Sequence, residues 1–535
     1  MTDPLNLEEL ELDWTLASKR LAKDVRDDFW PDPLELVDVL TRREATIERL
    51  RPSLKAFRPE TNAPLYHIPK ANFTLRDSIQ LSPTDRLVYQ ALVDPLAAHI
   101  DQHLTEAVFS HRLRGPAHKW MFKSGVEQWK AFRQAVATAA MASPGSFLVV
   151  TDLSQYFENV SFRHLKRHLE SLTTGTNLKR VVDTLHVCLK SWSPYKDCGL
   201  PQNIDASSFL GNALLDIVDR HMLREDHKYF RYMDDIQIVV ATEAEARVAL
   251  MRLIGHLREI GLGVNSAKTK RLRPDTSEME AFLCDTDPDL DAIEKAVRSM
   301  DRATVQKAVP TVYQKARMLI ESNDTSERAF RFCINRITSF RLYGNLDLPD
   351  DGDITLAVLS LLPTRPAESD TFCRYLSTAP LQDVHKKHLV RLLCDEPLCV
   401  YRWQNYLLWR LATQRKLVEE ALQRRARQVL QDAKDSPELA GAALYLGACG
   451  DYADRQAVLK GSRIPCTPFV RRCFTVALQE LHAADRAPAY RELAERDDEG
   501  HLLTAHLASL AAPIYVPAPP AVGLEDLPDH MPSVY

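Results

Sequence analysis

The twelve residues YFRYMDDIQIVV, at positions 229–240, most restrict how this chain can fold, because they set two adjacent carboxylates between two runs of strand-forming residues. Asp234 and Asp235 repel each other there. One interpretation is a plain hairpin, since Asp is common in tight turns. The other is that a bound cation holds the two carboxylates together.

A second strand favours the cation. SFLVVTDL, residues 146–153, is an apolar run of strand length that ends at Asp152, where an unpaired buried carboxylate would be strongly unfavourable. A strand end and a hairpin turn can meet at one edge of a sheet, and together they supply the oxygen ligands that Mg²⁺ prefers. Two such ions can clamp the attacking and leaving oxygens of a phosphoryl transfer. We therefore predict a magnesium site formed by Asp152, Asp234 and Asp235.

The order of elements predicts an α+β fold in the first half. Helical patterns at 129–142 and 207–223 alternate with the strands, which indicates helices packed on one face of a small antiparallel sheet. With 17 glycines, the chain has too few for an all-β protein built on tight turns.

Beyond about residue 290 the strand pattern ends. Amphipathic blocks separated by Pro, Gly or Asp follow one another, as in stacked helix pairs, although no strict period is visible. We predict an all-α, HEAT-like helical-repeat region over 291–512, a helical extension over 1–60, and a flexible Pro-rich tail over 513–535.

The composition limits the kinds of protein that this chain can be. The net charge of -5 means that any nucleic-acid surface must be a local patch. No apolar run approaches the roughly 20 residues of a membrane span, and the acidic start is unlike a signal peptide. The 10 cysteines form no CxxC pair, which indicates reduced thiols and no zinc site. We expect a cytoplasmic protein.

Three segments resemble, in order, the palm motifs of reverse transcriptases: TDLSQYFENV (151–160), GLPQNIDASSFLGNALL (199–215) and YMDD (232–235). LREIGLGVNSAKTK (257–270) is similar to the next palm motif, and AFLCD (281–285) to the primer grip.

Upstream, YHIPKANFTLRD (66–77) and LSPTDRLVYQALVDPL (81–96) resemble the fingers motifs of bacterial reverse transcriptases. The resemblance implies fingers and palm of a right-hand polymerase over 61–290. It also implies an RNA-directed DNA polymerase, a nucleotidyltransferase that uses Mg²⁺, with Mn²⁺ as the alternative ion.

The resemblance also implies residue roles. Asp152 and Asp234 match the metal ligands, Asp235 matches their charged partner, and Leu153 matches the residue whose backbone carbonyl meets a metal. Phe157 matches the steric gate that clashes with a ribose 2′-hydroxyl and so selects deoxynucleotides; the alternative is a ring that only packs under a helix.

Four further positions match nucleotide contacts. Gln202 matches the residue that lies against the nucleotide and template. Lys70 and Arg76 match the fingers cations that neutralise the triphosphate, and Lys268 matches the lysine that protonates pyrophosphate. For the three cations, ordinary solvation is the alternative.

Residues 111–133 are basic, with two interleaved tryptophans, Trp120 and Trp129. This pattern is typical of a strip along a nucleic-acid strand. The alternative is a solvated helix whose tryptophans belong to the core.

A palm followed by a helical half resembles the abortive-infection, defence-associated reverse transcriptases of bacteria. That implies antiphage activity, dNTPs as substrates, an RNA or noncoding-RNA template, a DNA product and a homo-oligomer. Some members use a protein tyrosine as primer and synthesise DNA without ordinary templating; Tyr515 and Tyr535 lie on the tail, but no tyrosine is singled out. The alternatives are a retron-like enzyme dedicated to its own RNA and an inert nucleic-acid-binding scaffold.

Overall fold

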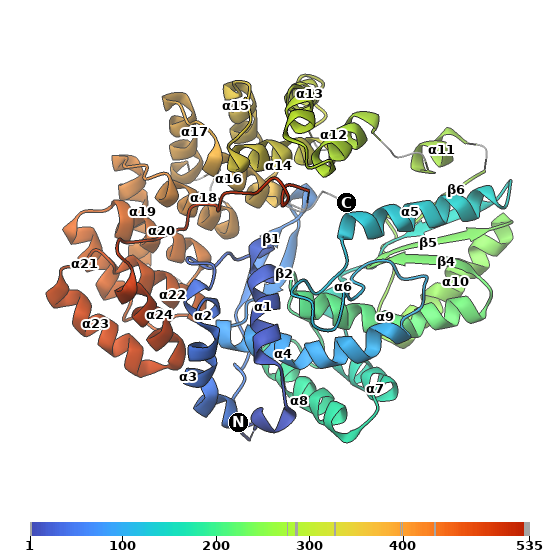
Figure 1. The fold of residues 1–535 in the computed structure, drawn as a ribbon, viewed down its shortest axis with the longest axis horizontal. Helices are drawn as coiled ribbons and strands as arrows, with labels where there is room; N and C mark the ends of the chain where they lie inside the picture. Colours follow the sequence, from blue (N-terminus) through green and yellow to red (C-terminus); the bar gives the residue numbers. More distant parts are fainter. Residues whose placement is uncertain are drawn as a thin grey trace. The chain divides into compact units, whose positions relative to one another are not determined.

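The computed structural model describes residues 3–274, 276–283, 287–325, 328–395, 397–398, 400–432 and 435–528. The chain forms two compact units (Figure 1). Unit 1 consists of Met1–Asp28, Arg42–Leu65 and Asp77–Asp285, and unit 2 of Phe29–Thr41, Tyr66–Arg76 and Thr286–Tyr535.

Unit 1 contains a four-stranded antiparallel sheet with the order β4-β5-β3-β6. Its strands are β3 (Phe147–Thr151), β4 (Lys228–Tyr232), β5 (Asp235–Val240) and β6 (Lys270–Leu272). Strands and helices together confirm the predicted α+β class.

Helices cover both faces of this sheet, whereas the sequence pattern had predicted one (Figure 1). On one face, Trp129 and Phe132 of α5 (Gly125–Met141) cluster with Leu148 and Val239. Helices α9 (Asp205–Arg224) and α10 (Glu243–Glu259) also contact the strands. Five consecutive residues of β5 are buried, which a strand covered on both faces requires.

Helix α4 (Pro83–Ile100) begins with Ser82 as its cap and is buried along most of its length. Further helices complete unit 1. They are η1 (Glu8–Leu10), α1 (Trp14–Asp24), η2 (Val25–Asp27), α3 (Arg43–Lys55), η4 (Asp101–His103), α6 (Tyr156–Asn159), α7 (Phe162–Leu172), α8 (Thr176–Trp192) and α11 (Ser277–Leu283). A two-stranded sheet consists of β1 (Leu65–Pro69) and β2 (Leu75–Ile79), with η3 (Ala71–Phe73) at its tip. Most of its residues are assigned to unit 2, and Leu65 and Asp77–Ile79 to unit 1.

Unit 2 is a two-row stack of helices. One row packs in the order α14, α16, α18, α20, α22, and the other in the order α13, α15, α17, α19, α21. This arrangement agrees with the predicted helical region. The bounds are α2 (Val37–Leu40), α12 (Pro288–Arg298), α13 (Arg302–Glu321), α14 (Arg328–Tyr343), α15 (Gly352–Leu361), η5 (Pro366–Glu368), α16 (Ser369–Thr378), α17 (Asp383–Cys394), α18 (Arg402–Gln414), α19 (Glu420–Asp432), α20 (Pro437–Cys449), α21 (Tyr452–Gly461), α22 (Pro468–Ala477), α23 (Ala483–Arg496) and α24 (Asp498–Ser509).

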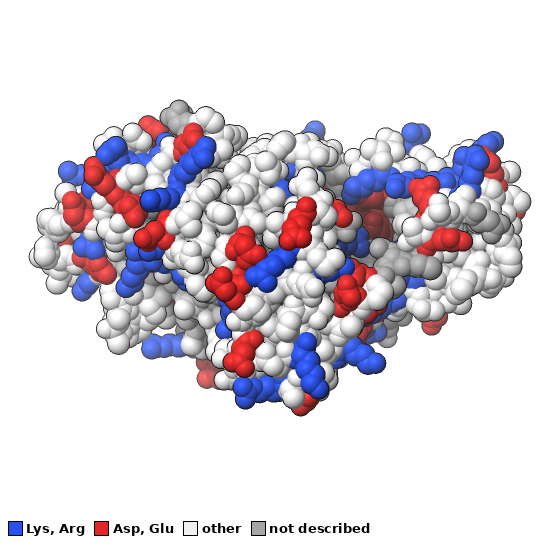
Figure 2. Space-filling view, turned by 90° about the horizontal axis from the view of Figure 1, so that it is seen from above, with Lys and Arg blue, Asp and Glu red and all other residues white. Residues whose placement is uncertain are grey.

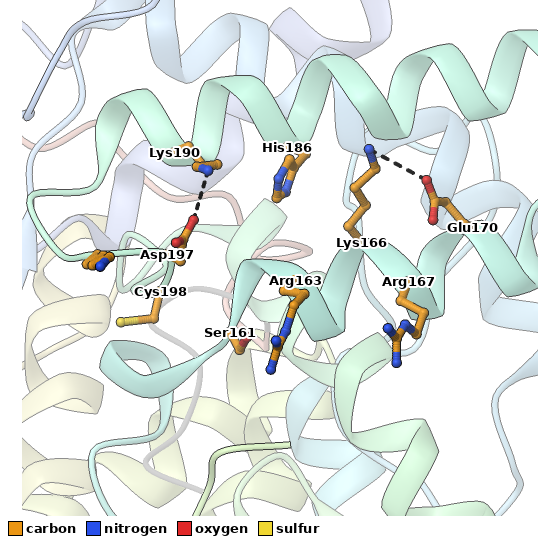
Figure 3. A pocket seen from close by; sticks show the side chains of 10 residues that line it. Ser161, Arg163, Lys166, Arg167, Glu170, His186, Lys190, Asp197 and Cys198 are labelled. Carbon is orange, nitrogen blue, oxygen red and sulfur yellow. Dashed lines mark ion pairs between the residues drawn. The ribbon is translucent and has the colours of Figure 1, made fainter. Parts of the chain in front are cut away.

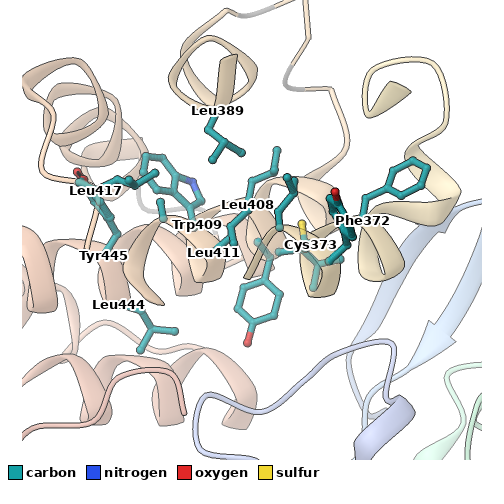
Figure 4. Packing of buried hydrophobic residues seen from close by; sticks show 14 of the residues in the cluster. Phe372, Cys373, Leu389, Leu408, Trp409, Leu411, Leu417, Leu444 and Tyr445 are labelled. Carbon is teal, nitrogen blue, oxygen red and sulfur yellow. Dashed lines mark hydrogen bonds between the residues drawn. The ribbon is translucent and has the colours of Figure 1, made fainter. Parts of the chain in front are cut away.

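The core of unit 2 lies along the first row. Phe372, Trp409 and Tyr445, from three successive helices of that row, belong to one buried cluster (Figure 4). Because α20 is packed on nearly all sides, its sequence is apolar around most of the helix rather than along one stripe. Helix α18 is buried to a similar extent but includes the polar residues Gln404 and Asn405.

Two short segments from the first half of the chain belong to unit 2. Trp30 and Ile68 are buried in its core, and the Trp403 indole N–H donates to the carbonyl of Phe29 at 2.6 Å. The Tyr66 hydroxyl lies 2.8 Å from that of Thr467. The region predicted as fingers and palm, 61–290, is therefore divided between the units.

The described part of the tail, residues 513–528, follows an extended course over unit 2 and makes contacts there, where the sequence pattern had predicted a flexible segment. The Tyr515 hydroxyl donates to the carbonyl of Gly447 at 3.0 Å, and Leu527 is fully buried. The carbonyl of Leu527 accepts a hydrogen bond from Arg336 at 2.9 Å. Tyr535 lies outside the described residues.

Figure 2 shows the charged side chains on one face of the molecule. On the face shown in Figure 2, basic and acidic side chains are interspersed. Among the residues that the structure describes, no helix is long and apolar enough to span a membrane.

Candidate active site

Strand register brings the three predicted carboxylates together. Thr151 pairs with Ile236 and Tyr232 with Asp235, so that Asp152, the next residue after β3, lies beside the β4–β5 turn. Asp152 lies close enough to Asp234 for its negative charge to act on the Asp234 carboxyl. Residues 82 positions apart in the chain thus meet at one edge of the sheet.

The electrostatics of this edge are unfavourable without a cation. Burial, together with the negative charges of Asp152 and Asp235, raises the pKa of Asp234 to about 7. Asp152 is buried, and its Oδ1 atom has no hydrogen-bond partner among the described residues. Its other oxygen accepts a hydrogen bond from the Lys268 ammonium.

These residues fit a hard divalent cation by chemistry. An orphaned buried carboxylate oxygen beside two further carboxyls is the kind of donor set that Mg²⁺ selects. No group of three or more His, Cys, Asp or Glu within the described ranges is already arranged as a metal site, so the carboxylates would have to adjust their side-chain angles to share an ion.

The turn that carries Asp234 is strained. Met233 has a φ of 57°, in the left-handed region that glycine favours, and its side chain is buried. Its backbone N–H donates to the Ser110 hydroxyl at 2.5 Å, and its carbonyl accepts from Arg231 at 2.9 Å. These two bonds hold the conformation that presents Asp234.

A buried network supports the Arg231 side of this turn. The Arg231 guanidinium donates to both carboxylate oxygens of Asp219, at 2.7 and 2.6 Å, and to the side-chain oxygen of Asn212 at 2.7 Å. Asn212 in turn donates to the carbonyl of Ser110 at 2.6 Å. Sequence reasoning missed this network, and its one indication is the presence of charged residues inside two apolar stretches, Arg231 in YFRYM and Asp219 in LLDIVDRHML.

Phe157 and Gln202 lie on adjoining segments. Phe157 is in α6, half-buried, and its carbonyl accepts the backbone N–H of Leu200 at 2.9 Å. The Gln202 amide donates to Glu158 at 3.0 Å. Gly199 has a φ of 94°, and a Cβ there would lie 2.6 Å from the ring of Tyr195, so this turn requires glycine.

The segment 263–269 places Lys268. The Asn265 N–H donates to the carbonyl of Asp152 at 2.7 Å, and the hydroxyls of Thr151 and Thr269 lie 2.7 Å apart. Leu153 is buried and pairs with Val264. Both predicted site residues, Leu153 and Lys268, are therefore adjacent to Asp152.

Lys70 and Arg76 belong to unit 2. The Lys70 N–H donates to the carbonyl of Thr74 at 2.7 Å, and the Arg76 guanidinium lies 5.2 Å from the ring centre of Phe29. Their contact with a triphosphate stays a prediction. The last two residues of the predicted primer grip, at 284 and 285, lie outside the described ranges.

The basic segment 111–133 is only partly a solvated strip. Arg112 pairs with Asp101 at 3.0 Å, Arg133 lies over the ring of Phe282, and Trp129 belongs to the core. Its remaining cations are exposed: Arg114, Lys119, Lys123 and Lys130.

A protein-family model matches part of the chain. Residues 68–307 match the family model for reverse transcriptase (RNA-dependent DNA polymerase). The chain therefore carries a reverse transcriptase domain, and this family consists of RNA-directed DNA polymerases. No curated protein sequence matches the chain significantly.

Two solved structures show weak similarity. The telomerase of Candida albicans, in complex with a fragment of telomeric RNA, is 12% identical with a TM-score of 0.31, over 64% of this chain and 63% of that chain. The telomerase of Candida tropicalis is 11% identical with a TM-score of 0.32, over 68% of each chain. The chain thus spans less than two thirds of the first telomerase, and neither similarity supports a conclusion about function.

Proposed function

We propose, from the reverse transcriptase domain over residues 68–307, that this protein is an RNA-directed DNA polymerase whose catalytic residues are Asp152, Asp234 and Asp235. The observation that supports this most is the meeting of the three carboxyls at one sheet edge, where the pKa of Asp234 is raised to about 7. The template is RNA, from a noncoding transcript or another source, and the product is DNA.

Bound Mg²⁺, or Mn²⁺ in its place, would supply charge neutralisation for the attacking and leaving oxygens of a two-metal phosphoryl transfer. Asp152 and Asp234 would hold it, with the Leu153 carbonyl nearby and Asp235 adding charge. The bonds from Ser110 and Arg231 fix the backbone of the turn beforehand, so that only the carboxylate side chains need to adjust when the ion binds.

The surrounding side chains act on the nucleotide. The Phe157 ring excludes a 2′-hydroxyl, and Gln202 orients the incoming base. Lys268, held on Asp152, can give its proton to the departing pyrophosphate. Lys70 and Arg76 neutralise the triphosphate.

The test is incorporation of labelled dNTPs by the purified full-length chain with Mg²⁺ on a primed RNA template. We expect dNTPs to be used far better than NTPs, and Asp234→Asn to abolish incorporation while the thermal melt stays folded. Glu106→Gln, which removes an exposed charge of unit 1, is the matched control. Unchanged incorporation by Asp234→Asn would show that these carboxylates are not the catalytic residues.

We also propose that the polymerase serves antiphage defence in the bacterial cytoplasm, as a homo-oligomer. The support is the pairing of a reverse transcriptase domain with a helical stack, which resembles the abortive-infection type. Phage plating on cells that express the wild type or Asp234→Asn tests this role. Equal protection by both would favour an inert scaffold, and dependence on a neighbouring RNA gene would favour the retron-like alternative.

The same product run on a denaturing gel tests protein priming. Tyr515 is buried and bonded to Gly447, so it is not free to act as a primer in this conformation. DNA that stays with the protein until protease is added would require another tyrosine.

A further inference from the structure

A cavity of about 670 Å³ lies in unit 1 between α7, α8 and the loop before Gly199 (Figure 3). Its lining is predominantly basic. Five of its side chains are Lys or Arg and only two are acidic: Arg163, Lys166, Arg167, Lys190 and Lys196 against Glu170 and Asp197. For a chain of net charge -5, this is a local concentration of positive charge.

Helical spacing creates this concentration. Arg163, Lys166 and Arg167 are three and four residues apart on α7, so they share one face of the helix. His186 and Lys190 are four apart on α8, which packs against α7. Side chains of both helices therefore line the same cavity (Figure 3).

Some of these charges are already neutralised and others are not. Lys166 pairs with Asp183 at 2.6 Å and Lys190 with Asp197 at 2.9 Å. Arg163, Arg167 and Lys196 form no ion pair within the part of the chain that the structure describes. His186 adds a buried Nδ1 atom that also lacks a hydrogen-bond partner among the described residues. The cavity thus holds an unbalanced positive charge.

The wall of the cavity continues into the segments assigned to the nucleotide. Ser161 pairs with Cys198, and the N–H of Gly199 donates to the carbonyl of Val160 at 3.2 Å. The next bond in this series joins Leu200 to the carbonyl of Phe157. A strand bound in the cavity would therefore lie on the same pair of segments that present Phe157 and Gln202.

We propose that this cavity binds the phosphate backbone of a single-stranded segment of the nucleic-acid substrate. The proposal rests on the proposed polymerase function. Cations that surround a concave space suit one strand better than the broad surface of a duplex. The described lining contains no Phe, Tyr or Trp on which a base could stack, so the contacts would be made with phosphates rather than with bases.

The experiment measures binding of fluorescein-labelled oligo(dT) and oligo(rU) by anisotropy over a series of salt concentrations. The test protein is the full chain with Arg163→Gln, Arg167→Gln and Lys196→Gln combined. These side chains are exposed, so the variant should fold, and its thermal melt verifies this. The charge-matched control combines Lys19→Gln, Arg224→Gln and Arg258→Gln, three exposed cations outside the cavity.

We expect the test variant to bind about tenfold more weakly at low salt and the control to bind like the wild type. At roughly 0.7 per phosphate contact, loss of three contacts should also lower the slope of log K against log salt by about 2. At saturating template and primer, dNTP incorporation by the test variant should return to the wild-type rate, because the carboxylates are untouched.

Equal affinity and slope for the test variant and the wild type would overturn the proposal. So would a variant that keeps oligonucleotide binding but no longer binds dTTP or inorganic triphosphate, which would identify a small polyphosphate as the ligand. Failure of the polymerase function is seen separately, as absence of dNTP incorporation by the wild type. Asp234→Asn keeps the cavity intact. Its oligonucleotide binding therefore tests the cavity proposal independently of catalysis.

Discussion

At the residue scale, Phe157 is the side chain to which we assign sugar selection. Replacement by Ala removes the ring but keeps the carbonyl that holds Leu200, so the loop that presents Gln202 should stay in place. We expect the dNTP-to-NTP incorporation ratio to fall at least about tenfold, or roughly 1.4 kcal/mol. Competing labelled nucleotides measure this ratio, and an unchanged ratio with normal dNTP use would mean that the ring only packs against Tyr156.

Arg231 is a positioning residue whose effects on stability and on catalysis can be separated. Arg231→Leu leaves Asp219 buried without its counter-charge, which should destabilise unit 1 by about 3–5 kcal/mol. Adding Asp219→Leu removes that charge and should recover most of the loss. Both variants should incorporate dNTPs poorly, because the Met233 carbonyl has lost its donor.

Urea unfolding and single-turnover incorporation provide the two measurements for this pair. The double variant is decisive. Recovery of stability together with wild-type incorporation would show that Arg231 serves the core alone and not the turn.

Single residues were predictable from the sequence where their environment is local. Asp152 and Asp234 end or interrupt apolar strands, so their placement could be inferred from alternation and strand length. Arg231 and Asp219 pair across a strand and a helix, and no local pattern distinguishes such a buried pair from two surface charges. Lys268 was expected near pyrophosphate, but its contact with Asp152 depends on how segment 263–269 packs.

At the element scale, close packing of α20 against α22 depends on Gly447. A Cβ at this position would lie 2.4 Å from the carbonyl oxygen of Ala477, in the backbone of the neighbouring helix. Gly447→Ala should therefore destabilise unit 2 by about 1–3 kcal/mol.

Gly255→Ala in α10 is the matched control, since a Cβ there meets no atom within 4 Å. Alanine in an open helix position should stabilise it by about 0.5–1 kcal/mol relative to glycine. Urea unfolding of both variants measures the contrast, and equal effects would mean that the α20–α22 contact yields to the added methyl group.

The segment 29–41 is anchored to unit 2 by a buried ionic cluster that should respond to pH. Arg472 binds Asp32 at 2.7 Å and Asp38 at 2.8 Å. Burial alone would raise the pKa of Asp32, but Arg472 and the N–H groups of Leu34 and Leu36 outweigh it, so that this pKa lies below its usual value.

Because the folded state then binds fewer protons than the unfolded state, the contribution of Asp32 is fully present above the unfolded pKa of about 3.9. It is lost as the pH falls below that value, through the folded pKa. Urea unfolding at stepped pH should show this loss in the wild type and a weaker one in Asp32→Asn. Identical pH profiles would mean that Asp32 does not contribute through its charge.

Helices and strands were predictable where the spacing of apolar residues is enough to identify them. The helical second half was expected from its amphipathic blocks, and β3 and β5 from their strand-length apolar runs. The covering of the sheet on both faces, and the packing of tail residue Tyr515 against Gly447, could not be foreseen. Both depend on contacts between segments far apart in the chain, which periodicity does not record.

At the scale of the whole molecule, the chain passes between the units after Asp28, Thr41, Leu65, Arg76 and Asp285. A sequence boundary near residue 290 therefore does not separate two independent folding units. Unit 2 takes part of its core from the first half of the chain, including Trp30, Leu34 and Ile68.

This sharing predicts how a fragment should behave. A chain of residues 1–285 would keep Trp30, Leu34 and Ile68 without the helices that bury them, and we expect it to aggregate even though it contains all three carboxylates. Changing these three residues to Ser in the fragment should restore a monodisperse species in size-exclusion chromatography, because the exposed apolar area is then reduced. The same three changes in the full chain should instead unfold unit 2, since each creates a cavity or buries an unpaired hydroxyl. A wild-type 1–285 fragment that is monomeric and folded would show that these segments do not depend on unit 2.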